Sequence, residues 1–243
     1  MVKIAIISDI HGNKEALRAV LRDAEARGAE RVWCLGDIVG YGPEPSEVIE
    51  ELRRRGAVLI AGNHDLAVAG KMGLEEFNPV AARAAEWTRE RLTRFERDFL
   101  AELPLVRIEG AFTLVHGSLR SPEWEYLLTA AQAAAHFALQ TTPYSAVGHS
   151  HLPFTAAEAD GLPVMRRLED GEAIPLGGGR LIINPGGAGQ PRDGDRRAPY
   201  MLYDEDSAAV AFHRVPYDFE ATQRKIRDAG LPEFLAARLA EGR

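Results

Sequence analysis

The chain has 243 residues, 46% hydrophobic and 27% charged, which fits one globular domain, and we expect a single domain over residues 1–243. No stretch reaches the about 18 consecutive apolar residues of a membrane span, and the apolar run after Lys3 is too short for a signal peptide, so we expect a cytoplasmic protein with no membrane partner. The formal net charge of −7 argues against long nucleic acid as a partner. It does not exclude small phosphate compounds as ligands, because bound metal cations can make the local electrostatic potential positive.

The first part of the chain alternates short apolar runs with helical patterns. Runs at residues 2–7, 31–35 and 57–61 predict strands, and helices are predicted after Asn13 and from Pro45, where apolar residues recur at helical spacing. The lone Cys34 lies in the second run, so we expect a buried thiol without chemistry. This alternation predicts βαβ units, in which ligands bind beyond the carboxyl ends of parallel strands.

The rest of the chain changes character. Asn78-Pro79 predicts a helix start, and Thr93 with Glu96 has the spacing of a capping box. From residue 105 on, strands are predicted at 105–108, 112–115, 144–147, 164–168, 173–176, 180–183, 200–203 and 208–215, with helices at 129–139, at 219–229 and after Pro232. We expect the strands of this half to pair in an antiparallel or mixed arrangement. The whole pattern therefore favours two packed sheets with helices outside over one doubly wound sheet.

Polar residues gather in five loops that follow apolar runs: Asp9 and His11; Asp37; Asn63 and His64; His116; His149 and His151. Five of the seven histidines lie there, whereas His136 in a helical segment and His213 in a strand are not expected to bind metal. Carboxylate, amide and imidazole donors without thiolate suit Mn, Fe or Zn. The donors are too many for one ion, so we expect two divalent ions roughly 3.5 to 4 Å apart, bridged by a carboxylate.

The order Asp-x-His, Gly-Asp, Gly-Asn-His-Asp, His-Gly and Gly-His-Ser-His resembles the calcineurin-like metallophosphoesterases, from Asp9 to the loop at residues 184–186. The resemblance implies an α/β (α+β) fold, a four-layer α/β/β/α sandwich of two mixed β-sheets flanked by helices. It also implies the metal ligands: Asp9, His11 and His151 for one ion, Asn63, His116 and His149 for the other, and Asp37 as the bridge. His64 matches the catalytic, non-ligand histidine beside the scissile phosphate, and Asp65 its orienting partner.

The resemblance therefore implies a dinuclear phosphoesterase in which a metal-bridged hydroxide attacks a small phosphate ester or nucleotide. Protein serine/threonine phosphatases, and the symmetrical dinucleoside tetraphosphatases resembling them, carry an Arg and a Glu where this chain has Tyr41 and Asp65. The chain looks instead like a smaller bacterial and archaeal branch, for which phosphodiesters and dinucleoside polyphosphates are both expected.

Three residues are predicted to bind substrate. They are Asn63, Tyr41, which would stack on a base, and Arg192, which would bind a distal phosphate. Packing for Tyr41 and simple solvation for Arg192 are the alternatives. The alternative functions are a phosphomonoesterase, including a protein phosphatase, and a catalytically idle scaffold on the same fold.

Overall fold

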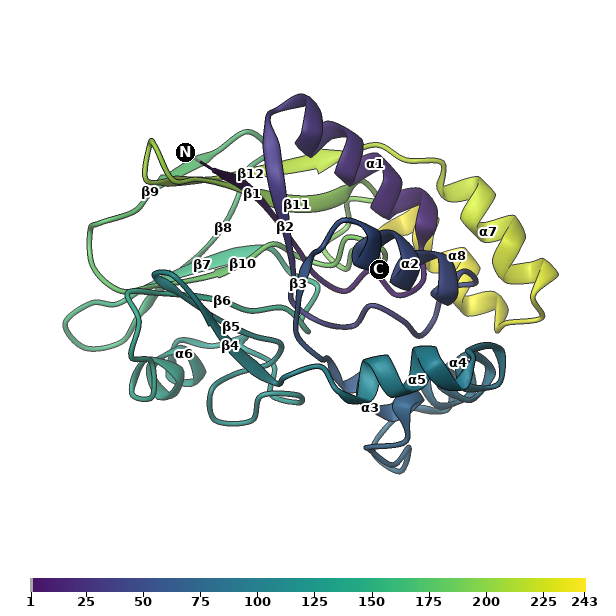
Figure 1. The fold of residues 1–243 in the computed structure, drawn as a ribbon. Coiled ribbons are helices and arrows are strands. Elements are labelled where there is room, and N and C mark those ends of the chain that lie inside the picture. Colours follow the sequence, from purple (N-terminus) through teal and green to yellow (C-terminus); the bar gives the residue numbers. More distant parts are fainter. Residues whose placement is uncertain (1) are drawn as a thin grey trace.

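The structure is a computed structural model that describes residues 2–243, which form strands in two sheets with helices around them (Figure 1). The strands are β1 (Lys3–Ile7), β2 (Ala29–Cys34), β3 (Val58–Leu59), β4 (Val106–Glu109), β5 (Phe112–Val115), β6 (Tyr144–Ala146), β7 (Phe154–Ala157), β8 (Val164–Arg167), β9 (Ala173–Pro175), β10 (Leu181–Asn184), β11 (Ala198–Asp204) and β12 (Ala209–Val215). The helices are α1 (Lys14–Ala26), α2 (Pro45–Arg54), α3 (Asn63–Ala69), α4 (Pro79–Arg91), α5 (Arg94–Ala101), α6 (Ala130–Phe137), α7 (Phe219–Asp228) and α8 (Glu233–Glu241).

Both sheets have six strands and mix parallel with antiparallel pairing. The first has the order β3-β2-β1-β11-β12-β9, with β1, β2 and β3 parallel and the other pairs antiparallel. The second has the order β4-β5-β6-β10-β7-β8, with β5, β6 and β10 parallel. The β1-α1-β2-α2-β3 segment confirms the predicted βαβ units, and the second half confirms the predicted mixed pairing.

The layers follow from the alternation of side chains along the strands. In β1, Ile4 and Ile6 share a buried cluster with Phe112 of the second sheet. Ala5 and Ile7 point the other way and share a cluster with Leu17 of α1. Because both faces of β1 are covered, its sequence is a continuous apolar run.

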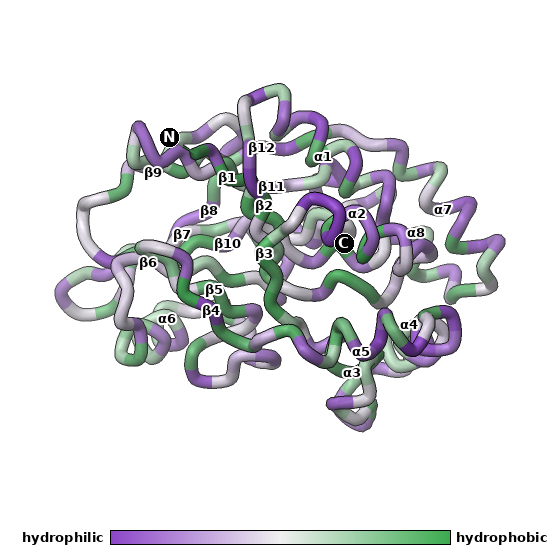
Figure 2. Tube along the Cα trace, in the orientation of Figure 1, coloured by the Kyte–Doolittle hydropathy of each residue, from purple (hydrophilic) through white to green (hydrophobic). Residues whose placement is uncertain are grey.

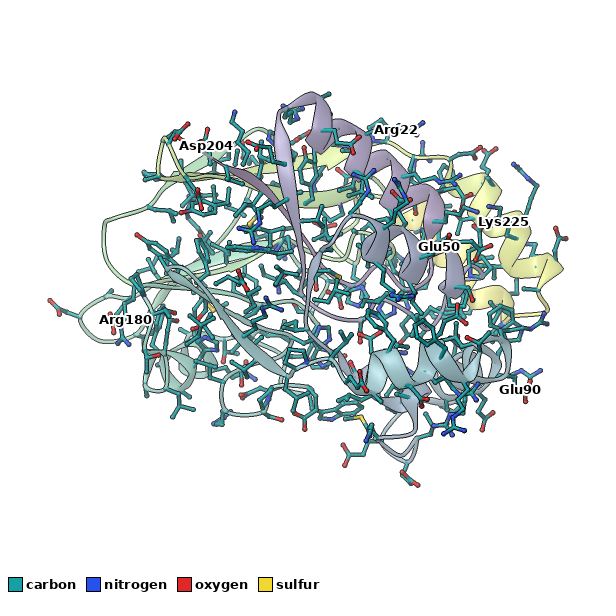
Figure 3. All side chains as sticks on the ribbon, viewed as in Figure 1. Arg22, Glu50, Glu90, Arg180, Asp204 and Lys225 are labelled. Atoms are coloured by element: carbon teal, nitrogen blue, oxygen red, sulfur yellow. The ribbon has the colours of Figure 1, made fainter. Side chains whose placement is uncertain are left out.

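Helix α6 covers the outer face of the second sheet, where Ala133 and Phe137 pack in one cluster with Phe154 of β7. The succession of helices, sheet, sheet and helix confirms the predicted four-layer α/β/β/α sandwich. Hydrophobic positions concentrate in the central strands (Figure 2), and labelled charged side chains such as Arg22 and Glu50 point away from the helices (Figure 3). No helix within residues 2–243 is long and apolar enough to cross a membrane.

Three local expectations need correction. Asn63 and His64, expected in a loop, begin the helix α3, whose cap Gly62 has no side chain that would indicate a helix start. β7 has no counterpart among the predicted strands, because Pro153 directly precedes a run of only four residues. The third apolar run contains only the two-residue strand β3.

Candidate metal centre

The predicted ligands converge at one edge of the two sheets. Asp9 and His11 follow β1, Asp37 follows β2, His116 follows β5, and His149 and His151 follow β6, while Asn63 begins α3. These strands end at the same edge because they run parallel within each sheet, and chain loops there can face one another. The edge therefore gathers side chains from both sheets.

The loops at this edge hold their residues in an unfavourable backbone conformation. Seven non-glycine residues within 2–243 have positive φ, and six of them lie at the site with φ of 50° to 63°: Asp9, His11, Asp37, Tyr41, His149 and His151. Each such residue costs of order 1 kcal/mol or more, so surrounding contacts must compensate. His11 N–H, for example, donates to Asp37 O at 2.9 Å, which ties the first loop to the second. Strain concentrated in this way is typical of functional sites.

The donor atoms form two groups that share Asp37. The first comprises Asp9, His11, Asp37 and His151, and the second Asp37, His116 and His149, with the donor atoms of each group within 4.8 Å of one another. Oδ2 of Asp37 lies 3.5 Å from His11 Nε2 and 3.4 Å from His116 Nε2. Nε2 of His151 lies 3.2 Å from Asp9 Oδ1. Neither His136 nor His213 belongs to a donor group found within residues 2–243.

Main-chain carbonyls orient all four imidazoles. In three of them the Nδ1–H donates and Nε2 faces the site: His11 to Val39 O at 3.0 Å, His116 to Leu35 O at 2.7 Å, and His151 to Gln190 O at 2.5 Å. His149 is reversed, because its Nε2–H donates to Trp124 O at 3.0 Å and Nδ1 is left for the site. Such partners fix the tautomer and ring orientation of metal-binding histidines.

Buried polar atoms without hydrogen-bond partners show what the site lacks. Oδ1 of Asp9, Oδ1 of Asn63 and Nε2 of His116 are buried and have no hydrogen-bond partner. Leaving such groups unpaired costs about 1–3 kcal/mol each, so a compensating ligand is expected where they converge. Two carboxylates, an amide oxygen and several imidazoles suit a divalent cation. The residues present therefore fit metal ions.

The ionisation of the buried carboxylates and histidines also favours a cation at this site. Burial opposes ionisation of Asp37, yet His116 and neighbouring histidines hold the pKa of Asp37 well below its usual range. Burial likewise opposes protonation of His116, but Asp37 and Asp9 raise its pKa to about 9. For His11, burial prevails and lowers the pKa, so that its imidazole is neutral and can act as a ligand. Two buried carboxylates thus draw positive charge into the site.

His64 lies beside the metal ligands without joining a donor group. Its main-chain N–H donates to Asp37 Oδ1 at 2.9 Å, and its ring packs 4.4 Å from that of Tyr41 and 5.1 Å from that of Phe77. A Cβ at Gly40, which has φ of +87°, would approach His64 Nδ1 to 2.5 Å, so glycine makes room for the imidazole. Burial lowers the pKa of His64 to about 4, and the ring is neutral at pH 7.

The expected pairing of Asp65 with His64 is absent from the structure. Asp65 Oδ2 accepts the N–H of Gly62 at 3.0 Å and Oδ1 accepts that of Val39 at 3.1 Å. Nδ1 of His64 is buried and has no hydrogen-bond partner. Asp65 therefore caps α3 and joins it to the Asp37 loop, because its short side chain at the third helical position reaches back to the cap.

A cleft with a volume of about 410 Å³ opens beside the donor groups and is lined by Asp37, Asn63, His64, His149 and His151 together with Tyr41, Phe77, Trp124, Tyr126 and Arg192. Tyr41 is only 7% exposed and its ring packs 4.6 Å from that of His11, so little of it is left for stacking on a base. The sequence analysis does not identify Phe77, Trp124 and Tyr126, which lie in connections outside any periodic pattern. Aromatic residues inside a charged loop, as in Glu123-Trp124-Glu125-Tyr126, are the signal that would have marked them.

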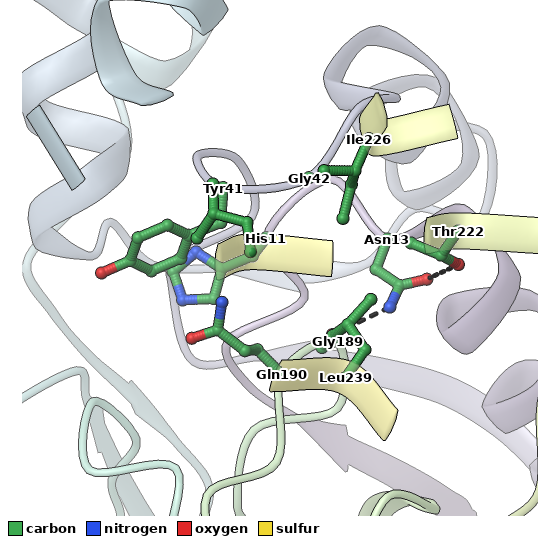
Figure 4. Close-up of a pocket in the computed structure, with 10 residues that line it drawn as sticks. His11, Asn13, Tyr41, Gly42, Gly189, Gln190, Thr222, Ile226 and Leu239 are labelled. Carbon is green, nitrogen blue, oxygen red and sulfur yellow. Dashed lines mark hydrogen bonds between the residues drawn. The ribbon is translucent and has the colours of Figure 1, made fainter. Parts of the chain in front are cut away.

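Asn13 ties the first metal loop to the C-terminal part of the chain. Its Oδ1 caps α1 at Ala16 N, 3.1 Å away, and accepts a hydrogen bond from Thr222 Oγ1 at 3.0 Å. Its Nδ2 donates to Gly189 O at 2.8 Å, and Gly189 N–H donates to Asp9 O at 3.0 Å. Figure 4 shows Asn13 between Gly189 and Thr222, close to His11. One buried side chain thus joins three segments around the site.

Comparison with known proteins places this geometry in a family. The sequence profile described as a calcineurin-like phosphoesterase superfamily domain matches residues 2–208. The crystal structure of a metallophosphoesterase from Sphaerobacter thermophilus is similar over 100% of this chain and 99% of that chain, with a TM-score of 0.91 and 45% identity. An uncharacterized protein of Methanocaldococcus jannaschii is 40% identical over 100% of both chains.

More distant similarity reaches a symmetrical bis(5′-nucleosyl)-tetraphosphatase of Aromatoleum aromaticum, which is 33% identical over 103 residues, or 40% of this chain and 36% of that protein. The chain thus spans well under half the length of this relative. The profile match covers most of the chain, and the Sphaerobacter structure shares its whole fold. The chain belongs to the calcineurin-like phosphoesterase superfamily and is a hydrolase acting on phosphate esters.

Proposed function

We propose that this protein is a dinuclear metal-dependent phosphoesterase that hydrolyses phosphodiesters or nucleotide-derived substrates such as dinucleoside polyphosphates. The observation that carries the proposal is that two donor groups share Asp37 at the floor of an open cleft. Asp9, His11 and His151 would hold one divalent ion, Mn, Fe or Zn, and Asn63, His116 and His149 the other. When bound, two such metal ions supply positive charge that neutralises the phosphoryl oxygens, and a hydrolytic nucleophile at neutral pH.

The chain's own residues would position the substrate. The neutral imidazole of His64 lines the cleft and can donate an N–H to a phosphoryl or leaving-group oxygen. The guanidinium of Arg192 is held by the amide oxygen of Gln190 at 2.9 Å, and no carboxylate of residues 2–243 forms an ion pair with it. Because no carboxylate among these residues neutralises its charge, Arg192 can bind a phosphate other than the one cleaved.

The lining of the cleft favours a diester over a monoester. Arg192 is the one cationic side chain among the lining residues, while Tyr41, Phe77, Trp124 and Tyr126 are aromatic. A phosphodiester carries less negative charge than a monoester and a second organic group, which aromatic walls accommodate. Similarity to symmetrical bis(5′-nucleosyl)-tetraphosphatases supports nucleotide-derived substrates, although Tyr41 and Asp65 replace residues typical of those enzymes.

The test compares bis(p-nitrophenyl) phosphate with p-nitrophenyl phosphate, using metal-stripped protein with and without Mn²⁺. We expect turnover only with metal, and a higher kcat/KM for the diester. Asp37→Asn should abolish turnover, whereas Asp98→Asn, at a carboxylate with 63% of its side chain exposed on α5, should not alter it. Preference for the monoester would favour a phosphomonoesterase, and no turnover with any divalent metal would favour a scaffold.

A further inference from the structure

Three aromatic side chains wall the cleft next to the proposed metal ligands. Phe77 comes from the connection between α3 and α4, and Trp124 and Tyr126 come from the connection between β5 and α6. The rings of Phe77 and Trp124 meet edge to face with centroids 5.2 Å apart. The ring of Tyr126 stacks on that of His149 with centroids 3.9 Å apart and an angle of 18° between the planes.

Core packing does not account for this wall. Trp124 and Tyr126 belong to none of the hydrophobic clusters found within residues 2–243, and Phe77 only borders one. Tyr126 is 41% exposed, although one face of its ring is covered by His149. Exposing large aromatic surface to water is unfavourable unless a ligand covers it, so the wall indicates a binding surface for a flat, apolar group.

The rim of the cleft adds polar groups suited to the edge of such a ligand. Glu76 and Asn78 flank Phe77 and line the same cleft. Oδ1 of Asn78 accepts the N–H of Ala81 at 3.0 Å, which leaves its NH₂ group as a donor. The carboxylate of Glu76 is an acceptor, so a planar ring with hydrogen-bonding edges would find both a stacking surface and polar partners.

We propose that Phe77, Trp124 and Tyr126 form a nucleobase subsite, so that the phosphate ester cleaved at the adjacent centre carries a nucleoside. The inference rests on the proposed function and narrows its substrate class. The same cleft is lined by Asp37 and by these rings, so one molecule can place a phosphate at the first and a base on the second. Stacking on aromatic side chains tolerates every base because each base has a π-face.

The test uses two diesters with the same leaving group, the p-nitrophenyl ester of thymidine 5′-phosphate and its abasic deoxyribose counterpart. The ratio of their kcat/KM values isolates the base, and we expect the wild-type ratio to be about 10 or more. Trp124→Ala and Phe77→Ala should bring the ratio toward one, and Trp124→Phe should restore most of it. The carbonyl of residue 124, which orients His149, remains in each variant. Phe95→Ala, at a phenylalanine 62% exposed on α5, is the control and should keep the wild-type ratio.

Binding provides a second readout that does not depend on turnover. We expect adenosine 5′-monophosphate to bind the metal-reconstituted protein about tenfold more tightly than ribose 5-phosphate, and Trp124→Ala to remove the difference. Absence of turnover on both diesters would contradict the proposed function, while the binding difference would still support the subsite. Equal kcat/KM values for the two diesters, together with equal binding of the two phosphates, would overturn the nucleobase subsite and leave the phosphoesterase activity intact.

Discussion

Replacing His64 by alanine separates the proposed chemistry from metal binding. The structure indicates that the metals stay, because the contact from residue 64 to Asp37 is made by the main-chain N–H at 2.9 Å. What is lost is one imidazole N–H donor to the phosphoryl group, and removing one such donor typically lowers kcat about 100- to 1,000-fold. Steady-state hydrolysis of an aryl phosphodiester measures the loss, and elemental analysis measures the metal. Unchanged kcat, or loss of metal, would refute the role given to His64.

A second substitution perturbs the same imidazole without removing it. In Gly40→Ala the new Cβ would lie 2.5 Å from His64 Nδ1, so the ring must move, and we expect activity to fall at least about tenfold. Gly171 is the matched control. Its φ of +86° is nearly the same as the +87° of Gly40, so alanine causes similar backbone strain at both positions, but nothing lies within 4 Å of a Cβ added at Gly171. Gly171→Ala should lose stability but keep its activity. Equal activity of the two variants would show that the close approach to His64 does not matter.

Three further predictions concern stability and metal affinity. Burial lowers the pKa of His136 to about 4 against 6.5 for the free group, so the unfolded chain binds the proton more tightly. Stability is therefore full above pH 6.5 and falls by about 3 kcal/mol on acidification to pH 4, and urea unfolding of His136→Asn should lack that share of the loss. Asn13→Ala removes a helix cap and leaves buried groups unpaired, so urea unfolding should show about 2–3 kcal/mol lower stability, and an unchanged midpoint would contradict this. Gly187→Ala would place a Cβ 2.6 Å from His151 Nδ1, and calorimetry should show Mn²⁺ binding weakened by about tenfold or more, whereas unaltered affinity would speak against His151 as a ligand.

The parts of the fold that are readable from the sequence have local chemical signals. Helices α1, α4, α5 and α6 begin directly after Asn13, Asn78, Thr93 and Thr129, whose side chains cap them, and the sequence predicts each start. Helix α3 follows Gly62, which has no such side chain, and it is missed. The ligand positions are readable for a similar reason, because each follows a buried strand and such strand ends meet at one edge.

The features that could not be predicted from the sequence depend on contacts between distant segments. Asp65 looks like a partner of its neighbour His64, but its Oδ1 accepts the N–H of Val39 from another loop. Phe77 and Trp124 come from separate connections and contact each other in the wall of the cleft, and no periodic pattern in the sequence indicates that contact. The positive φ of Asp9 is likewise invisible in the sequence, since it is maintained by hydrogen bonds that only the assembled loops provide.

The number of divalent ions bound per chain tests the central proposal most directly. Metal-stripped protein would be reconstituted with Mn²⁺, freed of excess by gel filtration and analysed for metal. The sharing of Asp37 between two donor groups predicts about two ions per wild-type chain and fewer in Asp37→Asn. Active wild-type protein with a single ion, or Asp37→Asn that retains two, would contradict a dinuclear centre bridged by Asp37.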